Sequence, residues 1–337
     1  MLNIISRSAK AKFVGGQIKV FQNLVKGLDK IGYSYVVNRR LDACEKLWIH
    51  DDVRALPLIK KLPPEIKVVV GPNLYVMPRD MPKRLDLRRA TYLHPCAWAA
   101  DIWKAHGFDL CPLRSWPVGI DTDMFSPVPH EDRKQVLIYH KHRDPAELEK
   151  LKSIVNALGM KHEVIVYGAY KQEDYLRALG QSKYVIWHGR HESQGIALQE
   201  ALARDIPILL WDVATFEQFW VGGGGCYLFT ESEKRFPVTA APYFDSSCGI
   251  KIGSIDEMVS AIGRMENEWS TFKPRDFVVK NLSLEKQARE LLDFYGDWQN
   301  ESAYEANSVA SAGGWRPPIG WVMEAGVRRL KGYLRLG

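Results

Sequence analysis

The sequence lacks the cysteine patterns that define two common kinds of small-domain scaffold. It contains only five cysteines, Cys44, Cys96, Cys111, Cys226 and Cys248, which are odd in number, widely spaced and without a Cys-x-x-Cys pair. Neither a disulfide framework nor a thiolate zinc site is therefore indicated. The chain also shows no internal period of the kind that predicts a solenoid or a propeller. Reduced thiols in a reducing compartment fit this pattern.

A long apolar segment at the start and a strong excess of one charge are also missing. The first ten residues contain a short apolar run around Asn3 and then turn basic. That run is too short for a secretory signal or a transmembrane helix, so we expect a cytoplasmic protein. Lys and Arg number 46 against 40 Asp and Glu, a net charge of +6. This surplus favours anionic ligands in general but does not argue for nucleic acid as a partner.

The length and composition are those of two globular domains. A chain of 337 residues exceeds the usual size of one hydrophobic core. Two α/β domains of roughly 120–170 residues each are therefore expected, with a cleft between them. We place the first domain at residues 1–127 and the second at 128–295. Residues 296–337 follow as a flexible connector and a basic tail.

The first domain begins with the pattern of a strand, a glycine loop and a helix. Leu2–Ile5 predicts a strand, and apolar residues recur at helical spacing after Val14-Gly15-Gly16-Gln17. Gly15 and Gly16 let the backbone approach a ligand closely, and the helix presents free N–H groups to an anion. A simple tight turn is the alternative explanation of the two glycines.

Three polar residues of the first domain follow predicted strands. His50 follows Trp48-Ile49, Asn73 follows Val68–Val70 and a Gly-Pro turn, and His94 ends the run that starts at Ala90. Open α/β sheets bind ligands at this edge, so His50, Asn73 and His94 are candidates for the acceptor side of a site. The alternatives are a surface position for His50 and a structural role for His94.

A first resemblance to a known family lies in Val118-Gly-Ile-Asp-Thr-Asp-Met-Phe-Ser-Pro127. It is similar to the segment Asn-Gly-Val-Asp-x-x-x-Phe-x-Pro, which joins the two domains of retaining glycosyltransferases with the GT-B fold. Gly119 permits a bend, Phe125 anchors the segment by burial, and Pro127 stiffens the start of a linker. The resemblance implies an α/β protein of GT-B architecture, with two Rossmann-like domains that face each other across a cleft.

Basic residues follow the first predicted strand of the second domain. The strand Gln135–Tyr139 continues into His-Lys-His-Arg-Asp-Pro, where Asp144 and Pro145 are start signals for a helix. Lys141 and Arg143 are then expected at a strand end and near a helix N-terminus, where a phosphate is favoured. In the resembled family an Arg and a Lys after this strand bind the donor diphosphate, although they are usually spaced further apart. A solvated basic loop is the alternative.

The most informative run extends from Tyr184 to Leu210 and predicts a strand, a polar loop, a helix and a strand. Glu192 falls in the loop, Gly195 lets the backbone come close to a ligand, and Glu200 lies in the mostly apolar helix. A buried Glu200 needs a partner, because an unpaired buried charge is costly. A partner Lys or Arg, or a position on an exposed edge, is the alternative to a ligand.

This run is similar to the Glu-x7-Glu signature of the retaining GT-B family known as glycosyl transferases group 1. The matches are Glu192, Gly195, Glu200, Ala201, Ala203 and Pro207, whereas Ser193, Gln194, Gln199 and Asp205 depart from the common form. The resemblance implies that Glu192 contacts hydroxyls of the transferred sugar and that Glu200 accepts hydrogen bonds from the ribose hydroxyls of the nucleotide. Gln194 stands where it would alter which sugar fits.

The expected site follows from the loops and the resemblance together. Tyr170 is included because, in related enzymes, the loop after the strand Glu163–Tyr167 passes near the nucleotide base. The expected donor-binding residues are Gly15, Gly16, Lys141, Arg143, Tyr170, Arg190, His191, Glu192, Ser193, Gln194, Gly195, Ile196 and Glu200. Among them, Glu192, Lys141 and Arg143 are the catalytic candidates.

The function that the resemblance implies is transfer of a hexose or pentose from a nucleoside-diphosphate sugar, with UDP or GDP, to a hydroxyl of a glycan or glycolipid. Anomeric configuration is retained, and neither a metal nor a cofactor is expected. Two other functions stay open on the same scaffold, a sugar-nucleotide epimerase and a non-catalytic protein that binds sugar nucleotides or glycans. A metal site is a further alternative, built from His140, His142, His188, His191 and Glu192.

The tail has a helical pattern of its own. Apolar residues from Val322 to Leu334 recur at helical spacing with Arg328, Arg329, Lys331 and Arg335 among them. A basic amphipathic helix of this kind favours peripheral contact with an anionic membrane. Packing against this chain or a partner is the alternative.

Overall fold

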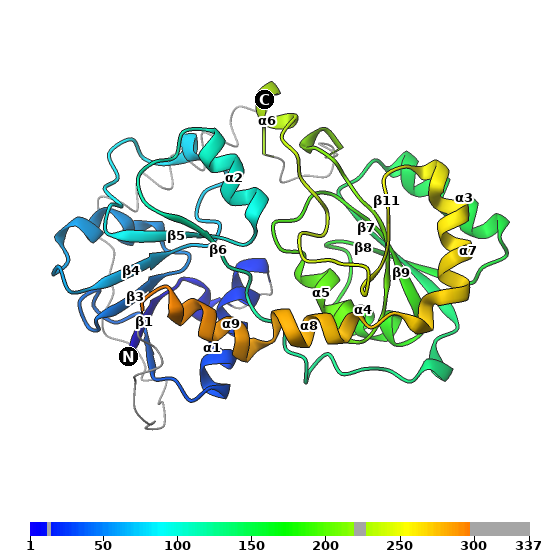
Figure 1. The fold of residues 1–337 in the computed structure, drawn as a ribbon, viewed down its shortest axis with the longest axis horizontal. Helices are drawn as coiled ribbons and strands as arrows, with labels where there is room; N and C mark the ends of the chain where they lie inside the picture. Colours follow the sequence, from blue (N-terminus) through cyan, green and yellow to red (C-terminus); the bar gives the residue numbers. More distant parts are fainter. Residues whose placement is uncertain (12–14, 219–226, 297–337) are drawn as a thin grey trace. The chain divides into compact units, whose positions relative to one another are not determined.

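The structure of the protein is a computed structural model that describes residues 1–11, 15–218 and 227–296. The chain forms two compact units. Of the described residues, unit 1 contains Met1–His94, Trp103–Trp116 and the chain from Ala288 to Gly296, and unit 2 contains Pro95–Ile102 and Pro117–Gln287. Each unit is built on its own parallel sheet with helices beside it, which confirms the expected α/β class (Figure 1).

Unit 1 has a parallel sheet of six strands in the order β2-β1-β3-β4-β5-β6. Its strands are β1 (Leu2–Ile5), β2 (Tyr35–Val37), β3 (Lys46–Ile49), β4 (Lys67–Val70), β5 (Ala90–His94) and β6 (Leu113–Ser115). Helix α1 (Gly16–Lys30) connects β1 to β2, as the sequence predicts. The short 3-10 helix η1 (Ser8–Lys10) precedes α1, and η2 (Val53–Lys61) and η3 (Pro78–Asp80) follow strands β3 and β4. Helices α2 (Ala97–Ala105) and α9 (Leu284–Asp293) belong to unit 1 from Trp103 and Ala288 onward.

Unit 2 has a parallel sheet of five strands in the order β11-β10-β9-β7-β8. Its strands are β7 (Gln135–Lys141), β8 (His162–Val166), β9 (Ser182–Gly189), β10 (Ile208–Trp211) and β11 (Gly249–Ile252). The helices are α3 (Pro145–Ala157), α4 (Gln172–Gly180), α5 (Ile196–Ala203), α6 (Glu231–Lys234), α7 (Met258–Glu268) and α8 (Pro274–Leu282). The described residues of unit 2 also contain the 3-10 helices η4 (His130–Asp132), η5 (Phe216–Gln218), η7 (Ile255–Glu257) and η8 (Trp269–Thr271).

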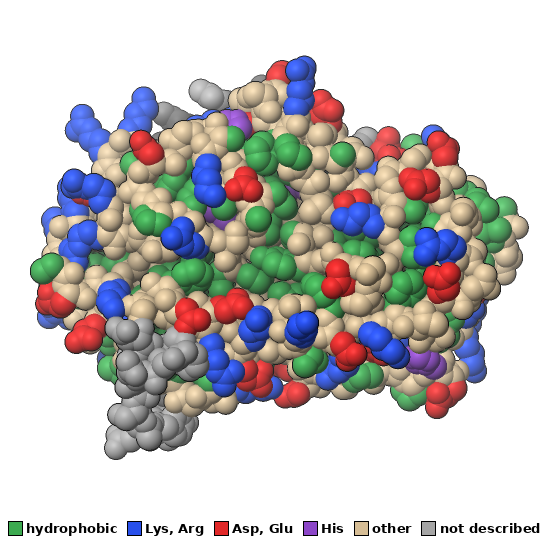
Figure 2. Space-filling view, in the orientation of Figure 1, with side chains coloured by type: hydrophobic (Ala, Val, Ile, Leu, Met, Phe, Trp, Pro, Cys, Tyr) green, Lys and Arg blue, Asp and Glu red, His purple; other side chains and the backbone are tan. Residues whose placement is uncertain are grey.

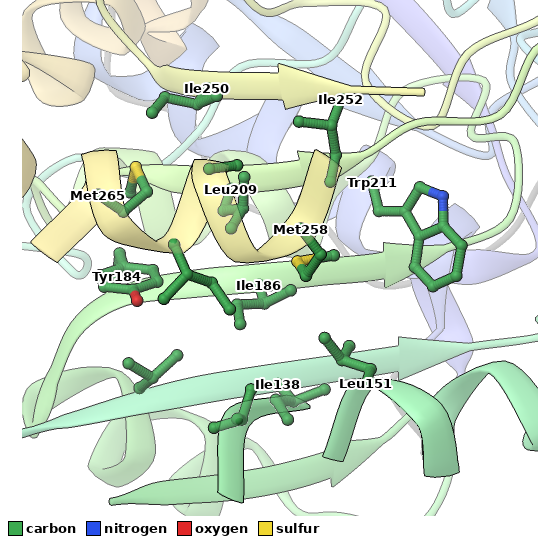
Figure 3. Close-up of a cluster of buried hydrophobic side chains, with 14 residues drawn as sticks. Ile138, Leu151, Tyr184, Ile186, Leu209, Trp211, Ile250, Ile252, Met258 and Met265 are labelled. Atoms are coloured by element: carbon green, nitrogen blue, oxygen red, sulfur yellow. The ribbon is translucent and has the colours of Figure 1, made fainter. Parts of the chain in front are cut away.

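One face of the unit 2 sheet carries an apolar core. Ile138, Ile186 and Leu209 come from neighbouring strands and are fully buried, because alternate strand residues point to the same face. Helices α3 and α7 cover this face, with Leu151 and Met258 packed against the strands (Figure 3). On the opposite face the Tyr139 ring of β7 meets the Tyr175 ring of α4 at 5.6 Å. This packing fixes which strand residues are left to form the polar edge of the sheet.

The surface of the molecule carries mixed charge. Figure 2 shows basic and acidic side chains interspersed over the visible face, which agrees with the small net charge of +6. Within the part of the chain that the structure describes, no helix is both long enough and apolar enough to cross a membrane. The expected amphipathic helix of the tail lies outside the described residues.

The division into units differs from the expected domain boundaries at residues 127 and 295. Apart from the short segment Pro95–Ile102, unit 2 begins at Pro117, and the chain returns to unit 1 at Ala288. The return has a structural reason, because the Tyr295 hydroxyl donates to the Leu47 carbonyl (3.0 Å) and the Lys67 ammonium donates to the Tyr295 carbonyl (2.6 Å). The end of the described chain is thereby held to strands β3 and β4 of unit 1.

The segment that follows Pro117 lies against the loop between α8 and α9. The Ile120 N–H donates to the Leu282 carbonyl (2.7 Å), and Phe125 is buried as expected. A Cβ atom at Gly119 would lie 2.6 Å from the Leu284 Cα and 2.8 Å from the Ser283 carbonyl oxygen. The glycine is therefore required by a close backbone approach, in addition to the bend expected from the sequence.

Gly119→Ala is expected to destabilise unit 2 by about 1–3 kcal/mol, because the added methyl group meets backbone atoms that cannot rotate away. Urea denaturation followed by circular dichroism measures the change. Gly263→Ala is the matched control, since a Cβ there meets no atom within 4 Å and the residue lies inside helix α7. A Gly119→Ala protein as stable as the Gly263→Ala protein would contradict the close approach.

Candidate functional site

The carboxyl ends of strands β7 and β9 form a topological switch point in unit 2. The chain leaves β7 toward β8 on one side and returns to β9 on the other side. Open α/β sheets bind ligands at such a point. His140 pairs with His188 and Lys141 with Gly189 in the register, and the Arg190 N–H donates to the Lys141 carbonyl (2.9 Å). The structure thus brings the two predicted polar loops side by side.

Lys141 and Glu192 form an ion pair at this edge. The Lys141 ammonium contacts Glu192 Oε1, and the two side chains are only 13% and 11% exposed. The same ammonium lies 4.2 Å from the centre of the Tyr167 ring. A pair with so little solvent contact is screened less than a surface pair, so each group depends on the other for charge compensation.

The loop that carries Glu192 is held through its backbone. The Glu192 N–H donates to the Thr239 carbonyl (3.0 Å), and its carbonyl accepts from the Trp98 indole N–H (3.2 Å). Gly195 caps helix α5 with a φ of 81°, a left-handed conformation that favours glycine. The direction of the Glu192 side chain is therefore set by fixed backbone on both of its sides.

Thr239 is in turn fixed by the residue that follows strand β10. The Asp212 carboxylate accepts from the Thr239 hydroxyl (2.8 Å) and from the Ala240 N–H (2.7 Å). Sequence reasoning missed Asp212 and Trp98 as parts of this edge. A signal was present for Asp212, because it is an acidic residue directly after a buried strand next to β9.

The side-chain amide of Gln194 forms hydrogen bonds to other groups of the protein. It accepts from the Val118 N–H (3.0 Å), donates to the Val118 carbonyl (2.8 Å) and donates to Gln199 Oε1 (3.0 Å). Gln194 and Gln199 are buried. Gln194 and Gln199, which both depart from the family pattern, therefore hold the start of the connecting segment to the loop through hydrogen bonds. The expected contact between Gln194 and a sugar stays a prediction.

Glu200 lies on the buried side of helix α5, close to tyrosine hydroxyls. Its side chain is buried, with the residue 3% exposed, so the alternative of an exposed edge is wrong. The Tyr170 hydroxyl forms a 3.0 Å hydrogen bond with the Tyr139 hydroxyl. Burial raises the pKa of the half-buried Tyr170, and the charges of Glu200 and Glu192 raise that pKa further. Both predicted carboxylates therefore act on one phenol.

Arg143 faces away from solvent. The residue is 1% exposed, its Nε donates to Glu147 Oε2 (2.9 Å), and its guanidinium lies 4.8 Å from the centre of the Trp211 ring. Burial lowers the pKa of Arg143, against the raising effect of Glu147. The solvated basic loop is therefore wrong for Arg143, and a ligand at the sheet edge meets Lys141 more readily.

Two histidines complete a buried polar network beside Arg143. His140 Nδ1 and His188 Nδ1 are 3.1 Å apart, and His188 Nε2 is 3.1 Å from Glu147 Oε2. Burial, together with the nearby His188, lowers the pKa of His140 to about 4. No group of three His, Cys, Asp or Glu side chains in the described chain is placed to hold a metal ion, so the alternative metal site gains no support there.

The remaining donor-loop residues lie around the same strand end. Arg190, Ser193 and Ile196 are half-buried, whereas His191 is buried against Phe216 at a ring distance of 4.3 Å. Burial lowers the pKa of His191 well below its ordinary value, so this imidazole is neutral near pH 7. Arg190 is thus, like Lys141, a half-buried cation at this strand end.

The three candidates of unit 1 lie at or just after the carboxyl ends of the adjacent strands β3, β4 and β5. His50 and His94 are buried, with exposures of 0% and 1%, so the surface alternative for His50 is wrong. Burial lowers the pKa to about 4 for His50 and to about 3 for His94. Asn73 is exposed and has a φ of 57°. The three residues thus share the carboxyl edge of the unit 1 sheet, and an acceptor role for them stays a prediction.

Gly15 and Gly16 begin helix α1 in unit 1. Gly15 is the N-cap with an extended φ of −154°, and no side chain caps the helix. A Cβ atom at either glycine would meet no atom within 4 Å. Within the described residues, neither a left-handed backbone nor close packing requires a glycine at these two positions. The loop just before them, residues 12–14, lies outside the described residues, so the tight turn stays an alternative.

The sequence matches no protein-family model and no curated protein. Solved structures are similar to this chain in fold. Sucrose-phosphate synthase from Thermosynechococcus elongatus is 11% identical with a TM-score of 0.54, over 87% of this chain and 98% of that chain. The catalytic domain of starch synthase IV from Arabidopsis thaliana, bound to ADP and acarbose, is 10% identical with a TM-score of 0.54, over the same shares of 87% and 98%.

A third structure, HepE of Anabaena in complex with UDP and glucose, is 9% identical with a TM-score of 0.50, over 88% of this chain and 99% of that chain. At such low identity these likenesses bear on the fold alone. Together with the two parallel sheets, they show that the chain has the GT-B fold.

Proposed function

We propose that this protein is a retaining glycosyltransferase. It transfers a hexose or pentose from a nucleoside-diphosphate sugar to a hydroxyl of a glycan or glycolipid acceptor in the cytoplasm, without a metal or a cofactor. The observation that carries the proposal is the ion pair of Lys141 and Glu192 at the switch point of unit 2, beside the buried Glu200. A cation and a carboxylate thus meet at the edge where open α/β sheets bind ligands.

The proposal assigns the donor groups by exposure and charge. Lys141 and Arg190 are the half-buried cations of the edge, so they bind the diphosphate more directly than Arg143. Glu192 accepts hydrogen bonds from hydroxyls of the sugar, and Glu200 accepts from the ribose diol, since a carboxylate offers two acceptor oxygens. The open backbone at Gly15 and Gly16 suits close approach by a ligand.

Catalysis in this scheme comes from positioning and from charge stabilisation. The leaving diphosphate gains negative charge as the glycosidic bond breaks, and the Lys141 ammonium stabilises that charge. The diphosphate takes the proton of the acceptor hydroxyl on the same face of the sugar, which gives retention. Glu192 holds the sugar in place while this happens, so the protein lowers the barrier mainly by orientation.

A nucleotide screen tests the proposal. The screen contains UDP, GDP and ADP, the glucose conjugate of each, and GDP-mannose. A ligand at about 100 times its dissociation constant stabilises a protein that binds it by about 2.7 kcal/mol and so raises the melting temperature. UDP and ADP are included because similar structures contain them. Turnover is then measured with a glycan and glycolipid panel, and proton NMR reads the anomer formed.

The outcomes separate the three functions. Transfer with retention, at a rate within about twofold with and without EDTA, supports the proposal, because a required divalent ion would be removed by the chelator. Nucleotide release without any acceptor favours the epimerase. Binding of a sugar nucleotide without turnover favours a binding protein, and a response to no nucleotide contradicts the donor site.

A further inference from the structure

Trp98 belongs to a short segment that stands apart from its neighbours in the chain. Pro95–Ile102 is part of unit 2, although the chain directly before and after it belongs to unit 1. The Tyr243 hydroxyl donates to the Pro95 carbonyl (2.5 Å), and the Trp98 indole N–H donates to the Glu192 carbonyl (3.2 Å). The segment is thus tied to the loops at the carboxyl edge of the unit 2 sheet.

The Trp98 bond is one of three links that hold Glu192. The Glu192 carboxylate pairs with Lys141, and its N–H donates to the Thr239 carbonyl (3.0 Å). Lys141 and Thr239 come from strand ends and loops that belong to unit 2 throughout. Trp98 fixes the other side of the residue, the carbonyl, and thereby the peptide plane between Glu192 and Ser193.

Ring contacts hold the indole in the orientation that this bond needs. The Trp98 ring meets the His191 ring edge to face at 6.0 Å and the Phe216 ring at 5.6 Å. His191 is buried and neutral, so it packs as an aromatic ring and brings no charge against the indole. Trp98 therefore contacts two consecutive residues of the loop, His191 by packing and Glu192 by hydrogen bonding.

We propose that Trp98 is a positioning residue for the loop that carries Glu192, and that it sets the rate of sugar transfer without touching the donor. This inference rests on the proposed transferase function. If the indole N–H is lost, the Glu192 carbonyl is released and its carboxylate samples directions away from the sugar. A displacement near 1 Å of a positioning group costs about 100-fold in rate, whereas nucleotide binding through Glu200 and the cations does not involve this bond.

The test compares Trp98→Phe with Trp103→Phe in the full chain. Both residues lie in helix α2, and each substitution keeps an aromatic ring and removes one indole N–H that donates to a backbone carbonyl outside the helix, that of Glu192 for Trp98 and that of Val76 for Trp103 (2.9 Å). Trp103 lies in unit 1 and serves as the matched control. The first readout is hydrogen exchange of peptides that cover residues 190–195, and the second is kcat and KM with the donor found in the nucleotide screen.

In Trp98→Phe, exchange at residues 190–195 is expected to rise about 2- to 10-fold, the equivalent of one lost hydrogen bond. The kcat is expected to fall about 10- to 100-fold, while the donor KM stays within about twofold. In Trp103→Phe, hydrogen exchange at residues 190–195 and the kcat are expected to stay as in the wild type.

Unchanged exchange in Trp98→Phe, or a kcat no lower than that of Trp103→Phe, overturns the proposal. A joint loss of kcat and nucleotide affinity also overturns it, because that result means general disruption. If the wild type transfers no sugar at all but exchange rises only in Trp98→Phe, the proposed function has failed and the link between Trp98 and the loop stands.

Discussion

Glu192→Gln is expected to lower kcat for sugar transfer by about 100- to 1000-fold, the size of effect seen when one charge-stabilising group is removed from an active site. The substitution keeps the shape of the side chain and an acceptor oxygen for Lys141, but it removes the negative charge. Sugar hydroxyls then lose a charged acceptor, and the Lys141 ammonium loses its compensating partner. Free nucleoside diphosphate lacks the sugar, so its affinity is expected to stay within about threefold.

The measurement combines steady-state kinetics with calorimetric titration of the free nucleotide. Glu233→Gln is the matched control, because Glu233 is also a buried carboxylate of unit 2, and it accepts from the Thr230 N–H (2.8 Å) at the start of α6. Equal losses of kcat in the two variants would mean that Glu192 acts only through stability. If the Glu192→Gln protein has the kcat of the wild type, Glu192 takes no part in the reaction.

Glu200→Gln is expected to weaken nucleotide binding by about 10- to 100-fold, since hydrogen bonds to a charged group contribute about 1.5–3 kcal/mol each. A ribose diol presents two hydroxyl donors, and the carboxylate accepts both, whereas an amide offers one acceptor oxygen. The loss is expected to be the same for the free diphosphate and for the sugar conjugate. At saturating donor the kcat is expected to change far less than in Glu192→Gln.

Titration calorimetry with the nucleotide from the screen measures this effect, and Glu233→Gln again controls for loss of a buried carboxylate. The two glutamate variants therefore dissociate binding from turnover. If Glu200→Gln binds the free diphosphate as tightly as the wild type, Glu200 does not face the ribose. Its burial near Tyr170 and Tyr175 would then be its whole role.

The elements of the fold followed from periodic patterns that local physics enforces. The strand Leu2–Ile5, the helix after Gly15 and Gly16, and the strand-loop-helix run around Glu192 all occur as the sequence predicts. Alternation or helical spacing of apolar residues decides these elements, because each must bury one face. The GT-B resemblance of the connecting segment and of the Glu-x7-Glu run agrees with the observed fold.

The roles of individual polar residues could not be predicted in the same way. Lys141 and Arg143 are two residues apart and look equivalent in the sequence. The structure pairs Lys141 with Glu192 at the carboxyl edge of the unit 2 sheet and places Arg143 between Glu147 of α3 and Trp211 of β10. Gln194 likewise looked like a sugar contact, and its amide is taken up by Val118 and Gln199.

The sequence by itself determined which segments form strands and helices and which loops carry carboxylates and cations. These properties depend on residues that are close in the chain. Only the tertiary structure decided that β7 lies beside β9, that Asp212 and Thr239 support Glu192, and that Trp98 contacts the same loop. The physical reason is that strand order and burial arise from packing between elements distant in the sequence, and local periodicity does not specify the partner of a buried face.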